Sequence, residues 1–483
     1  MAGNLTIGVD VGSTAVKVGI VDAEGSLVKY KSQIYPTKRV SNTIIEQNPD
    51  HWIDKIIAAL RLFEKFNFRK IKGFGICSQV NTHIFVDKQG NSLFPAIFWQ
   101  DSRAEKEALE LDHKVSREQK ISWWGAPMPI DSSHVLARML WVKRNHPNIW
   151  DKTAYVLLPK DYCIYKLTGQ VVTDPLSNIG LTNNNLQYIP EVLELVPGAS
   201  DRIAKLKSAD ELVGEIEHTL PFARTPVVNG TMDAWTGLLG AGGYKENSSV
   251  YLSGTSEILG INSKSLVPTP GIIVFPDWNN VKLHAGPTQS GGASKLWFCR
   301  LFKIKPHEMV KLVEDSKLND NTPIFLPHLQ GERAPIWHSG IRGLFYGLTS
   351  KTDKRQLARS VYEGIAFSAR WLLETLETSS LSNHPSINCG GGGFQSDVWN
   401  QIRSNILNKK INRLALKDPG ILGAAGLAAY AVGIYPSLTD TFENTVKFNS
   451  EYYPDRLAAE KYTERFKLFQ ELTENSINIS SKT

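Results

Sequence analysis

Cysteine is scarce in this sequence, and long apolar runs are absent. The 483 residues include only four cysteines, which form no CxxC pair and have no histidine cluster at metal-ligand spacing. This excludes a disulfide framework and a structural zinc site, and it favours a reducing compartment. No stretch approaches the length of a membrane span, and the opening residues MAGNLTIGVD enter a strand-like run with no charged leader. We therefore expect a cytoplasmic protein that does not associate with membranes.

An excess of charge of one sign is also missing. The formal net charge is +6, from 54 basic and 48 acidic residues, and the basic residues form only short, interrupted clusters. This excludes the electrostatic footprint of a nucleic-acid-binding protein, so we expect no nucleic-acid partner. Apolar residues are plentiful, with 42% of the chain hydrophobic and 21% charged. A chain of this length and composition is expected to form about two to three globular domains.

Two segments share a pattern of strand, small polar turn and strand. The first covers residues 5–22 with the turn Val-Gly-Ser-Thr, and the second covers residues 248–261 with the turn Ser-Gly-Thr-Ser. Small residues let backbone N–H groups approach phosphate oxygens closely. Either segment alone is more typical of a plain hairpin. Together, at the heads of two halves of similar size, they predict two α/β domains, 1–242 and 243–483, each with one phosphate-binding turn.

The most specific motif lies in the second half of the chain. Gly343–Leu348 is followed at fixed spacing by Gln356–Leu357 and Ser360–Glu363. Other motifs precede and follow it in order: Asp10–Thr14, Trp99–Arg103, Leu158–Tyr162, Gly230–Asp233, Ser253–Ser256, Pro327–Pro335 and Gly390–Gly393. In these motifs, which span nearly the whole chain, the sequence resembles the FGGY family of carbohydrate kinases, members of the actin-like ATPase superfamily. It departs from the family pattern at Arg138, where the family has lysine, and at Ser404–Asn405, where the family usually has an acidic residue.

The resemblance implies a fold and a reaction. The fold is α/β, with two ribonuclease-H-like (actin-like ATPase) domains around a central cleft. The first domain would bind the sugar and carry the first phosphate motif and the catalytic base, and the second would carry the other phosphate motif and the adenosine site. The implied reaction is ATP-dependent phosphorylation of a small sugar, with a xylulose-type ketopentose expected first. ATP and Mg²⁺ are the expected cofactors, a small sugar or polyol is the expected partner, and a homodimer is one assembly that this interpretation allows.

The first turn supplies groups that suit a phosphate. Gly12, Ser13 and Thr14 offer N–H and hydroxyl donors, and Asp10 precedes them at a strand end. Asp10 is expected to hold Mg²⁺ directly or through water, although it is also placed to cap the turn. Lys17 either adds positive charge near the phosphates or is an exposed strand lysine.

The second half supplies the remaining nucleotide contacts. By the same resemblance, Gly254 and Thr255 are expected to bind phosphate, and Gly392 and Gly393 are expected to let the adenine ring lie against bare backbone. Ser396 either contacts the adenine edge or caps the helix that starts at the next residue.

Asp233 is the predicted general base. It follows an apolar strand and Gly230, which allows a sharp turn of the backbone. A carboxylate at this point can accept the proton of the attacking hydroxyl and is also assigned here as a Mg²⁺ ligand. An aspartate after Gly-Thr is often only a turn cap, and it is the resemblance that favours catalysis.

The residues expected to contact the sugar are Gln79, His83, Asp101, Arg103 and Trp235, together with Asp233. His83 is equally suited to a structural role, and Asp101 with Arg103 is equally suited to an internal ion pair. The Ser78–His83 loop lacks the forms typical of xylulose and glycerol kinases, so the sugar is left open. A polyol kinase of the erythritol or glycerol type is the alternative enzyme. A non-transferring actin-like ATPase is the alternative class, and a catalytically inactive sensor is a third.

Overall fold

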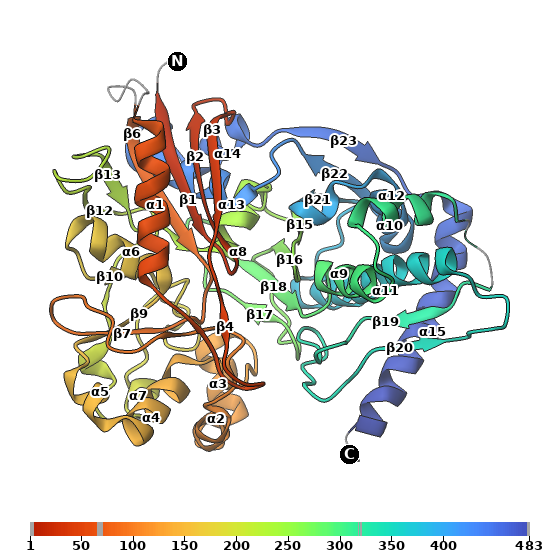
Figure 1. Ribbon diagram of the computed structural model, residues 1–483, viewed down its shortest axis with the longest axis horizontal. Coiled ribbons are helices and arrows are strands. Elements are labelled where there is room, and N and C mark those ends of the chain that lie inside the picture. Colours follow the sequence, from red (N-terminus) through yellow and green to blue (C-terminus); the bar gives the residue numbers. More distant parts are fainter. Residues whose placement is uncertain (1–3, 65–70, 317, 319–320, 481–483) are drawn as a thin grey trace. The chain divides into compact units, whose positions relative to one another are not determined.

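The computed structural model describes residues 4–64, 71–316, 318 and 321–480, and these form two compact units. Unit 1 consists of Met1–Tyr244, Phe275–Asn280 and Pro419–Val446. Unit 2 consists of Lys245–Val274, Val281–Asp418 and Lys447–Thr483. Residues 419–446 therefore pack with the first unit, although they come from the second half of the sequence (Figure 1). The division of function between residues 1–242 and 243–483 stays a prediction.

Unit 1 is built on a mixed seven-stranded sheet. Its order is β12-β13-β6-β1-β2-β3, with β14 also paired to β6. The pairs β1–β2, β2–β3 and β12–β13 are antiparallel, whereas β1–β6, β6–β13 and β6–β14 are parallel. The strands are β1 (Leu5–Val11), β2 (Ala15–Asp22), β3 (Leu27–Ile34), β6 (Ile71–Ser78), β12 (Leu212–Glu215), β13 (Pro226–Val228) and β14 (Thr231–Met232).

The two faces of this sheet carry different kinds of residue. On one face, Ile7 and Val9 of β1 join the apolar core to which α1 contributes. On the other face, α13 approaches so closely that a Cβ on Gly8 would collide with the carbonyl oxygen of Ile421. Because side chains alternate along a strand, Asp10 lies on the same face as Gly8, toward α13.

Ten helices among the described residues of unit 1 surround this sheet and a second apolar core beside it (Figure 1). They are α1 (Asp50–Phe63), α2 (Glu105–Asp112), α3 (Arg117–Trp124), α4 (Val135–Asn145), α5 (Pro147–Lys152), α6 (Pro159–Thr168), α7 (Pro190–Leu193), α8 (Asp233–Gly240), α13 (Pro419–Ala431) and α14 (Leu438–Thr445). Short sheets are formed by β4 (Lys38–Arg39), β5 (Ile45–Gln47) and β8 (Ala96–Ile97), by β7 (Ile84–Val86) with β9 (Tyr155–Leu157), and by β10 (Val172–Thr173) with β11 (Lys205–Leu206).

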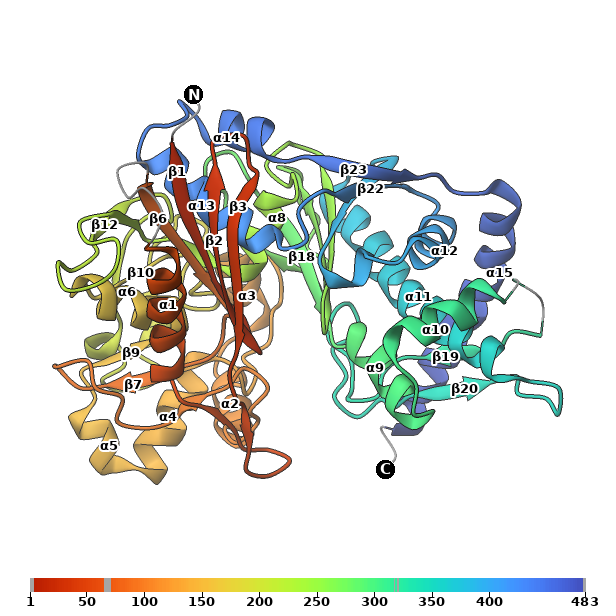
Figure 2. The ribbon, with the colours of Figure 1, turned by 45° about the horizontal axis from the view of Figure 1, so that its top comes forward.

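The sheet of unit 2 repeats the strand order of unit 1. Its order is β17-β18-β16-β15-β21-β22-β23, where β18, β16 and β15 are antiparallel neighbours and β15, β21 and β22 are parallel neighbours (Figure 1). The edge strand β23 runs beside β22 in Figure 2. The strands are β15 (Ser249–Ser253), β16 (Glu257–Asn262), β17 (Ile273–Val274), β18 (Leu283–Thr288), β21 (Ser386–Gly390), β22 (Lys410–Leu414) and β23 (Phe448–Tyr452). The predicted pair of strand–turn–strand segments is thus confirmed, and so is the duplicated α/β fold.

The long helix α11 organises the core of unit 2. It begins at a capping box in which Asp353 accepts from the backbone N–H of Gln356, and it packs on β16, β18 and α12. The helices are α9 (Gly292–Leu301), α10 (Pro306–Glu314), α11 (Lys354–Ser380), α12 (Asp397–Leu407) and α15 (Arg456–Ser480), and β19 (Ile324–Leu326) pairs with β20 (Leu344–Tyr346). Within the described ranges, no helix combines the length and the apolar character needed to span a membrane.

Candidate active site

The first phosphate turn lies between β1 and β2 of unit 1. The Gly12 N–H donates to the Ala15 carbonyl at 3.1 Å, which closes the turn and leaves Thr14 exposed. Asp10 and Lys17 are cross-strand partners next to the turn, and Lys17 Nζ donates to Asp10 Oδ2 at 3.2 Å. The predicted lysine therefore stands beside the turn, paired with Asp10, and its contact with a phosphate stays a prediction.

One oxygen of Asp10 fits the expected Mg²⁺. Asp10 Oδ1 is buried and has no hydrogen-bond partner among the described residues. Nowhere in the described part of the chain do three or more His, Cys, Asp or Glu residues gather as they would to enclose a metal. Mg²⁺ is commonly bound by one or two carboxylates together with substrate phosphates and retained waters, and Asp10 suits that kind of site.

Asp233 is the first residue of α8 and directly follows β14, which is separated from β1, the strand of Asp10, by β6 alone. Thr231 of β14 and Asp10 of β1 are the register partners of Cys77 on opposite sides of β6. Since neighbouring strands are about 4.8 Å apart, the strands that deliver the two aspartates are about 10 Å apart. Gly230 makes this possible, because its φ is 67° and a Cβ there would collide with the Ile76 carbonyl.

The environment of Asp233 alters its acidity. Burial raises the pKa of Asp233 from 3.8 to about 7, and the negative charge of Asp10 adds to the effect. The Ala234 N–H, which donates to Asp233 Oδ1 at 2.7 Å, acts in the opposite direction. A carboxyl with a pKa near neutrality is suited to accept a proton at physiological pH, because proton transfer is most efficient when the pKa of the base is close to the working pH.

The raised pKa predicts that Asp233→Asn affects stability in a pH-dependent way. The folded protein holds a proton on Asp233 between pH 3.8 and about 7, where the unfolded chain has lost it. Since stability falls with rising pH wherever the folded state binds more protons, this carboxyl destabilises the protein increasingly up to about pH 7. Asparagine removes the effect. We expect Asp233→Asn to raise the Tm of the nucleotide-free protein at pH 8 and to raise it less at pH 5.5, the difference corresponding to at most ~2 kcal/mol.

Thermal unfolding of both proteins at the two pH values measures this difference. Asp151 in α5 is exposed and supplies a matched control, Asp151→Asn. An equal gain at both pH values, or the same gain in the control, would contradict the assigned pKa.

A hydrogen-bond chain joins the predicted sugar loop to the phosphate turn. Gln79 Nε2 donates to Gln47 Oε1 at 2.8 Å, and Gln47 Nε2 donates to the Ser13 carbonyl at 3.0 Å. The Trp99 indole N–H donates to Ser13 Oγ at 2.9 Å. Gln79 Oε1 is buried and has no hydrogen-bond partner among the described residues, which suits a contact to a ligand hydroxyl.

Asp101 and Arg103, two other residues predicted to contact the sugar, form ion pairs within the protein. Arg103 donates to both oxygens of Asp101 at 2.7–3.0 Å and to Glu46 at 3.0 Å. Asp101 Oδ2 also accepts the Ile45 N–H at 2.6 Å. The pair has the geometry of the internal ion pair that the sequence left as an alternative, and a contact to sugar stays a prediction.

His83 and Trp235 are both buried in unit 1. His83 Nδ1 contacts Arg138 at 2.9 Å, and burial with this positive neighbour keeps the pKa of His83 well below its usual value. Trp235 has no exposed surface and packs edge-to-face against Phe275 and Trp278. The structure therefore gives each residue protein partners, and their sugar contacts stay predictions.

The second phosphate turn lies between β15 and β16 of unit 2. The Gly254 N–H donates to the Ser256 carbonyl at 2.9 Å, and both Gly254 and Thr255 are exposed. Ser253 Oγ donates to Glu257 Oε1 at 2.7 Å, and Arg403 of α12 donates to the same two side chains at 2.9 and 2.6 Å. A buried arginine thus fixes the base of this turn.

The predicted adenosine segment lies against the same arginine. Arg403 also donates to the Gly393 carbonyl at 2.9 Å, and a Cβ on Gly393 would collide with Ser253 Oγ. Gly392 is exposed, and an added Cβ there would meet no atom within 4 Å. Ser396 precedes α12, its hydroxyl makes no cap hydrogen bond, and its Oγ is buried without a partner among the described residues. The cap alternative is therefore not supported, and the adenine contact stays a prediction.

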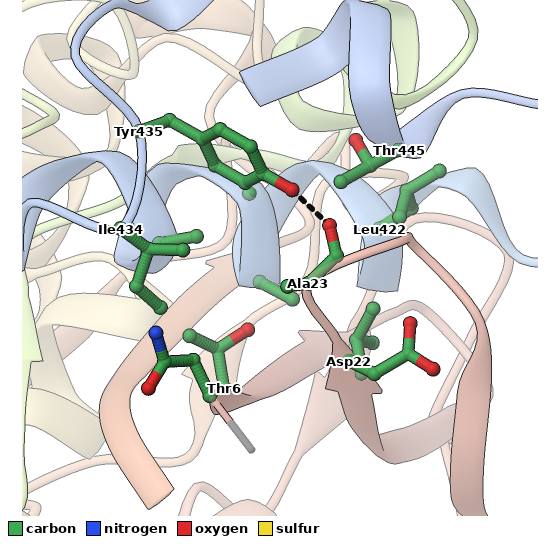
Figure 3. Close-up of a pocket in the computed structure, with 12 residues that line it drawn as sticks. Thr6, Asp22, Ala23, Leu422, Ile434, Tyr435 and Thr445 are labelled. Atoms are coloured by element: carbon green, nitrogen blue, oxygen red, sulfur yellow. Dashed lines mark hydrogen bonds between the residues drawn. The ribbon is translucent and has the colours of Figure 1, made fainter. Parts of the chain in front are cut away.

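A small pocket in unit 1 is distinct from these sites. Tyr435, Ile434, Leu422 and Asp22 are among its lining residues, and the Tyr435 hydroxyl donates to the Ala23 carbonyl (Figure 3). In the register of β1 and β2, Asp22 pairs with Leu5, at the opposite end of the hairpin from Asp10. The pocket is mostly apolar and lies away from the phosphate turn, so it is no candidate for the reaction.

Several residues that organise the site were absent from the sequence predictions. Gln47, Arg403 and Glu257 make their contacts with residues remote in sequence, and no local motif marks them. The Trp99–Arg103 motif indicated a functional segment. It did not indicate that the Trp99 indole donates a hydrogen bond to Ser13.

Comparison with known proteins agrees with this geometry. Residues 5–240 match the N-terminal domain of the FGGY family of carbohydrate kinases, and residues 250–432 match its C-terminal domain. Xylulose kinase of Bacillus subtilis is 27% identical to the chain, over 96% of each sequence. The solved ligand-bound xylulose kinase of Lactobacillus acidophilus superposes with a TM-score of 0.88, is 25% identical and covers 98% of each chain. Gluconate kinase from the same organism has a TM-score of 0.89, 24% identity and 99% coverage of each chain.

Proposed function

The chain belongs to the FGGY family and is a carbohydrate kinase, and from that premise we propose that it phosphorylates a ketopentose with Asp233 as the general base. The observation that carries the catalytic part is the position of Asp233. It begins α8 directly after β14, which is separated from the strand that bears Asp10 only by β6, and burial raises its pKa to about 7. Asp233 accepts the proton of the attacking hydroxyl as the phosphoryl group is transferred.

ATP is the phosphate donor in this proposal, as it is for kinases of this family. The N–H groups of Ser13 and Thr14 and the Ser13 hydroxyl hold phosphate oxygens in unit 1, at the turn that Gly12 closes, with Lys17 nearby. In unit 2 the phosphate lies against Gly254, whose N–H closes the turn, and receives the N–H of Thr255, while Gly392, Gly393 and Ser396 receive the adenosine. Asp10 is the carboxylate placed to hold Mg²⁺ with the phosphates, and Asp233 is a second. The metal, when bound, supplies charge neutralisation on the transferred group.

The charges near the predicted sugar contacts favour an uncharged substrate. Arg103 is paired with Asp101 and Glu46. Arg138 has no exposed surface, and its guanidinium donates to five backbone carbonyls besides its contact with His83. Neither cation is left for a carboxylate, so a ketopentose is favoured over an aldonate such as gluconate. Gln79, with its unpartnered buried oxygen, is the polar group proposed to bind a sugar hydroxyl.

Transfer of labelled γ-phosphate from ATP to a panel of acceptors tests this proposal. The panel contains D-xylulose, D-ribulose, a hexulose, D-gluconate, erythritol and glycerol. We expect the highest kcat/KM for a ketopentose. A higher value for gluconate would contradict the substrate, and ATP hydrolysis that no acceptor stimulates would contradict the kinase reaction.

A polyol kinase of the erythritol type is the second candidate. The same observation favours it, since paired arginines admit any uncharged polyol. The acceptor panel separates the two candidates, because only the polyol kinase would prefer erythritol or glycerol to both pentuloses.

A further inference from the structure

A buried ionic cluster lies directly behind the strand that carries the proposed base. Lys160, in the first turn of α6, is fully buried, and its Nζ lies 2.6 Å from Asp161 Oδ1 and 3.0 Å from Asp174 Oδ2. Both carboxylates are also buried. Burial opposes the charge on Lys160, but these two carboxylates outweigh it and raise the pKa of the ammonium group. The lysine therefore stays charged and holds both carboxylates.

The cluster reaches the catalytic segment through Thr231. Thr231 Oγ1 donates to Asp174 Oδ1 at 2.7 Å, and that oxygen also accepts the Ser177 N–H at 3.0 Å. The Lys160 N–H donates to Ser78 Oγ at 3.1 Å, and Ser78 is the β6 partner of Met232. Both residues of β14 are thus tied to the cluster, one by its side chain and one through its neighbour on β6. Asp233 follows them directly.

A contribution to stability does not by itself account for this arrangement. Well-packed apolar residues are often as stabilising as a buried ion pair, because two charges lose their hydration on burial. The cluster does provide directional hydrogen bonds that hold β14, a strand of only two residues, in place. Such a strand has few ladder bonds of its own, and catalysis is sensitive to displacements of about 1 Å.

We propose that Thr231, held by Asp174 and Lys160, is a positioning residue that fixes the Asp233 carboxylate with respect to Asp10. The proposal rests on the proposed role of Asp233. Thr231 itself does not touch the substrate in this mechanism. It acts by preventing β14 from shifting along β6, so that the base stays within hydrogen-bond reach of the sugar hydroxyl.

The first test replaces Thr231 by valine, which keeps the shape and removes the hydroxyl. We expect Thr231→Val to lower kcat by roughly 10- to 100-fold and to change KM for ATP by no more than about twofold. Thr231→Ser restores the donor and should recover most of kcat. Thr473→Val is the matched control, since Thr473 is a buried threonine of α15 whose hydroxyl donates to the Phe469 carbonyl at 2.8 Å. Both valine variants lose a buried hydroxyl, which in Thr231 contacts Asp174 and also Ser177 Oγ at 3.3 Å. Only Thr231→Val should lose kcat per folded molecule.

A double-mutant cycle with Asp233→Asn separates this proposal from the proposed base. If Thr231 acts through Asp233, Thr231→Val should have little further effect on the residual rate of Asp233→Asn. An Asp233→Asn enzyme with normal turnover would overturn the proposed base. Suppose instead that Asp233→Asn is strongly impaired and that adding Thr231→Val lowers kcat by the same factor as in the wild type. That result would overturn the positioning role and leave the proposed base standing. A Thr231→Val enzyme with wild-type kcat and a lowered Tm would also overturn it.

Discussion

Asp233→Ala is expected to lower kcat for sugar phosphorylation by about 10²–10⁴-fold, the usual contribution of a positioned general base. Affinity for ATP should change little, because the phosphate contacts proposed for unit 1 come from Gly12 to Thr14 and from Lys17. The physical reason lies in the buried site of Asp233, where the raised pKa makes the carboxylate a stronger base than an exposed aspartate. Alanine removes the only proton acceptor that the proposal assigns to the sugar hydroxyl.

Steady-state transfer of labelled phosphate measures this loss, and calorimetric titration with ADP measures nucleotide binding. Asp151→Ala in α5 is the control for an aspartate lost from an exposed position. Asp233→Glu keeps the carboxylate but moves it, so it should retain intermediate activity. Wild-type turnover in Asp233→Ala would remove Asp233 from the mechanism.

Arg403→Met is expected to reduce the free energy of unfolding by about 3–5 kcal/mol, the cost of leaving a buried partner charge uncompensated. Arg403 and Glu257 are at most 1% exposed, and Arg403 Nη2 lies 2.6 Å from Glu257 Oε1. The guanidinium also lies 3.7 Å from the Trp399 ring centroid. Methionine keeps much of the volume but leaves the Glu257 carboxylate, the Ser253 hydroxyl and the Gly393 carbonyl without this donor.

Urea unfolding followed by circular dichroism tests the prediction. Removing both charges, in Arg403→Met with Glu257→Leu, should restore much of the lost stability, because no unpaired charge remains. The control is Arg456→Met, which breaks an exposed pair with Glu460 on α15 and should cost no more than about 1 kcal/mol. Similar unfolding midpoints for Arg403→Met and Arg456→Met would show that the buried pair contributes no more to the free energy of unfolding than the exposed pair does.

The sequence predicted the features of the site that depend on local pattern. The turns at Gly12–Thr14 and Gly254–Thr255 were recognisable as a pair at the heads of the two halves of the chain, because either turn alone is typical of a plain hairpin. Asp233 was recognisable only through its motif, since an aspartate after Gly-Thr is a common turn cap. The matching strand order of the two sheets then confirmed that the two turns belong to duplicated α/β units.

Contacts between distant residues were beyond the reach of the sequence. Arg403 and Glu257 are 146 residues apart, and neither has neighbours that mark it as half of an ion pair. Arg103 also pairs with Glu46, which approaches from β5, and nothing near Asp101 and Arg103 in the sequence marked this third partner. Such pairings are decided by tertiary packing, and one sequence carries no local trace of them.

The close packing of α13 on the first sheet has a consequence for how the chain is made. The helix comes from residues 419–431, yet it covers a face of β1 and β6, strands that end by residue 78. During synthesis the ribosome therefore releases that sheet face several hundred residues before its cover exists. Contacts of such long sequence separation form slowly, and exposed apolar surface on the nascent chain attracts chaperones and aggregation partners. Chains terminated before residue 419 should accordingly be insoluble, even though they contain Asp10, Asp233 and both phosphate turns.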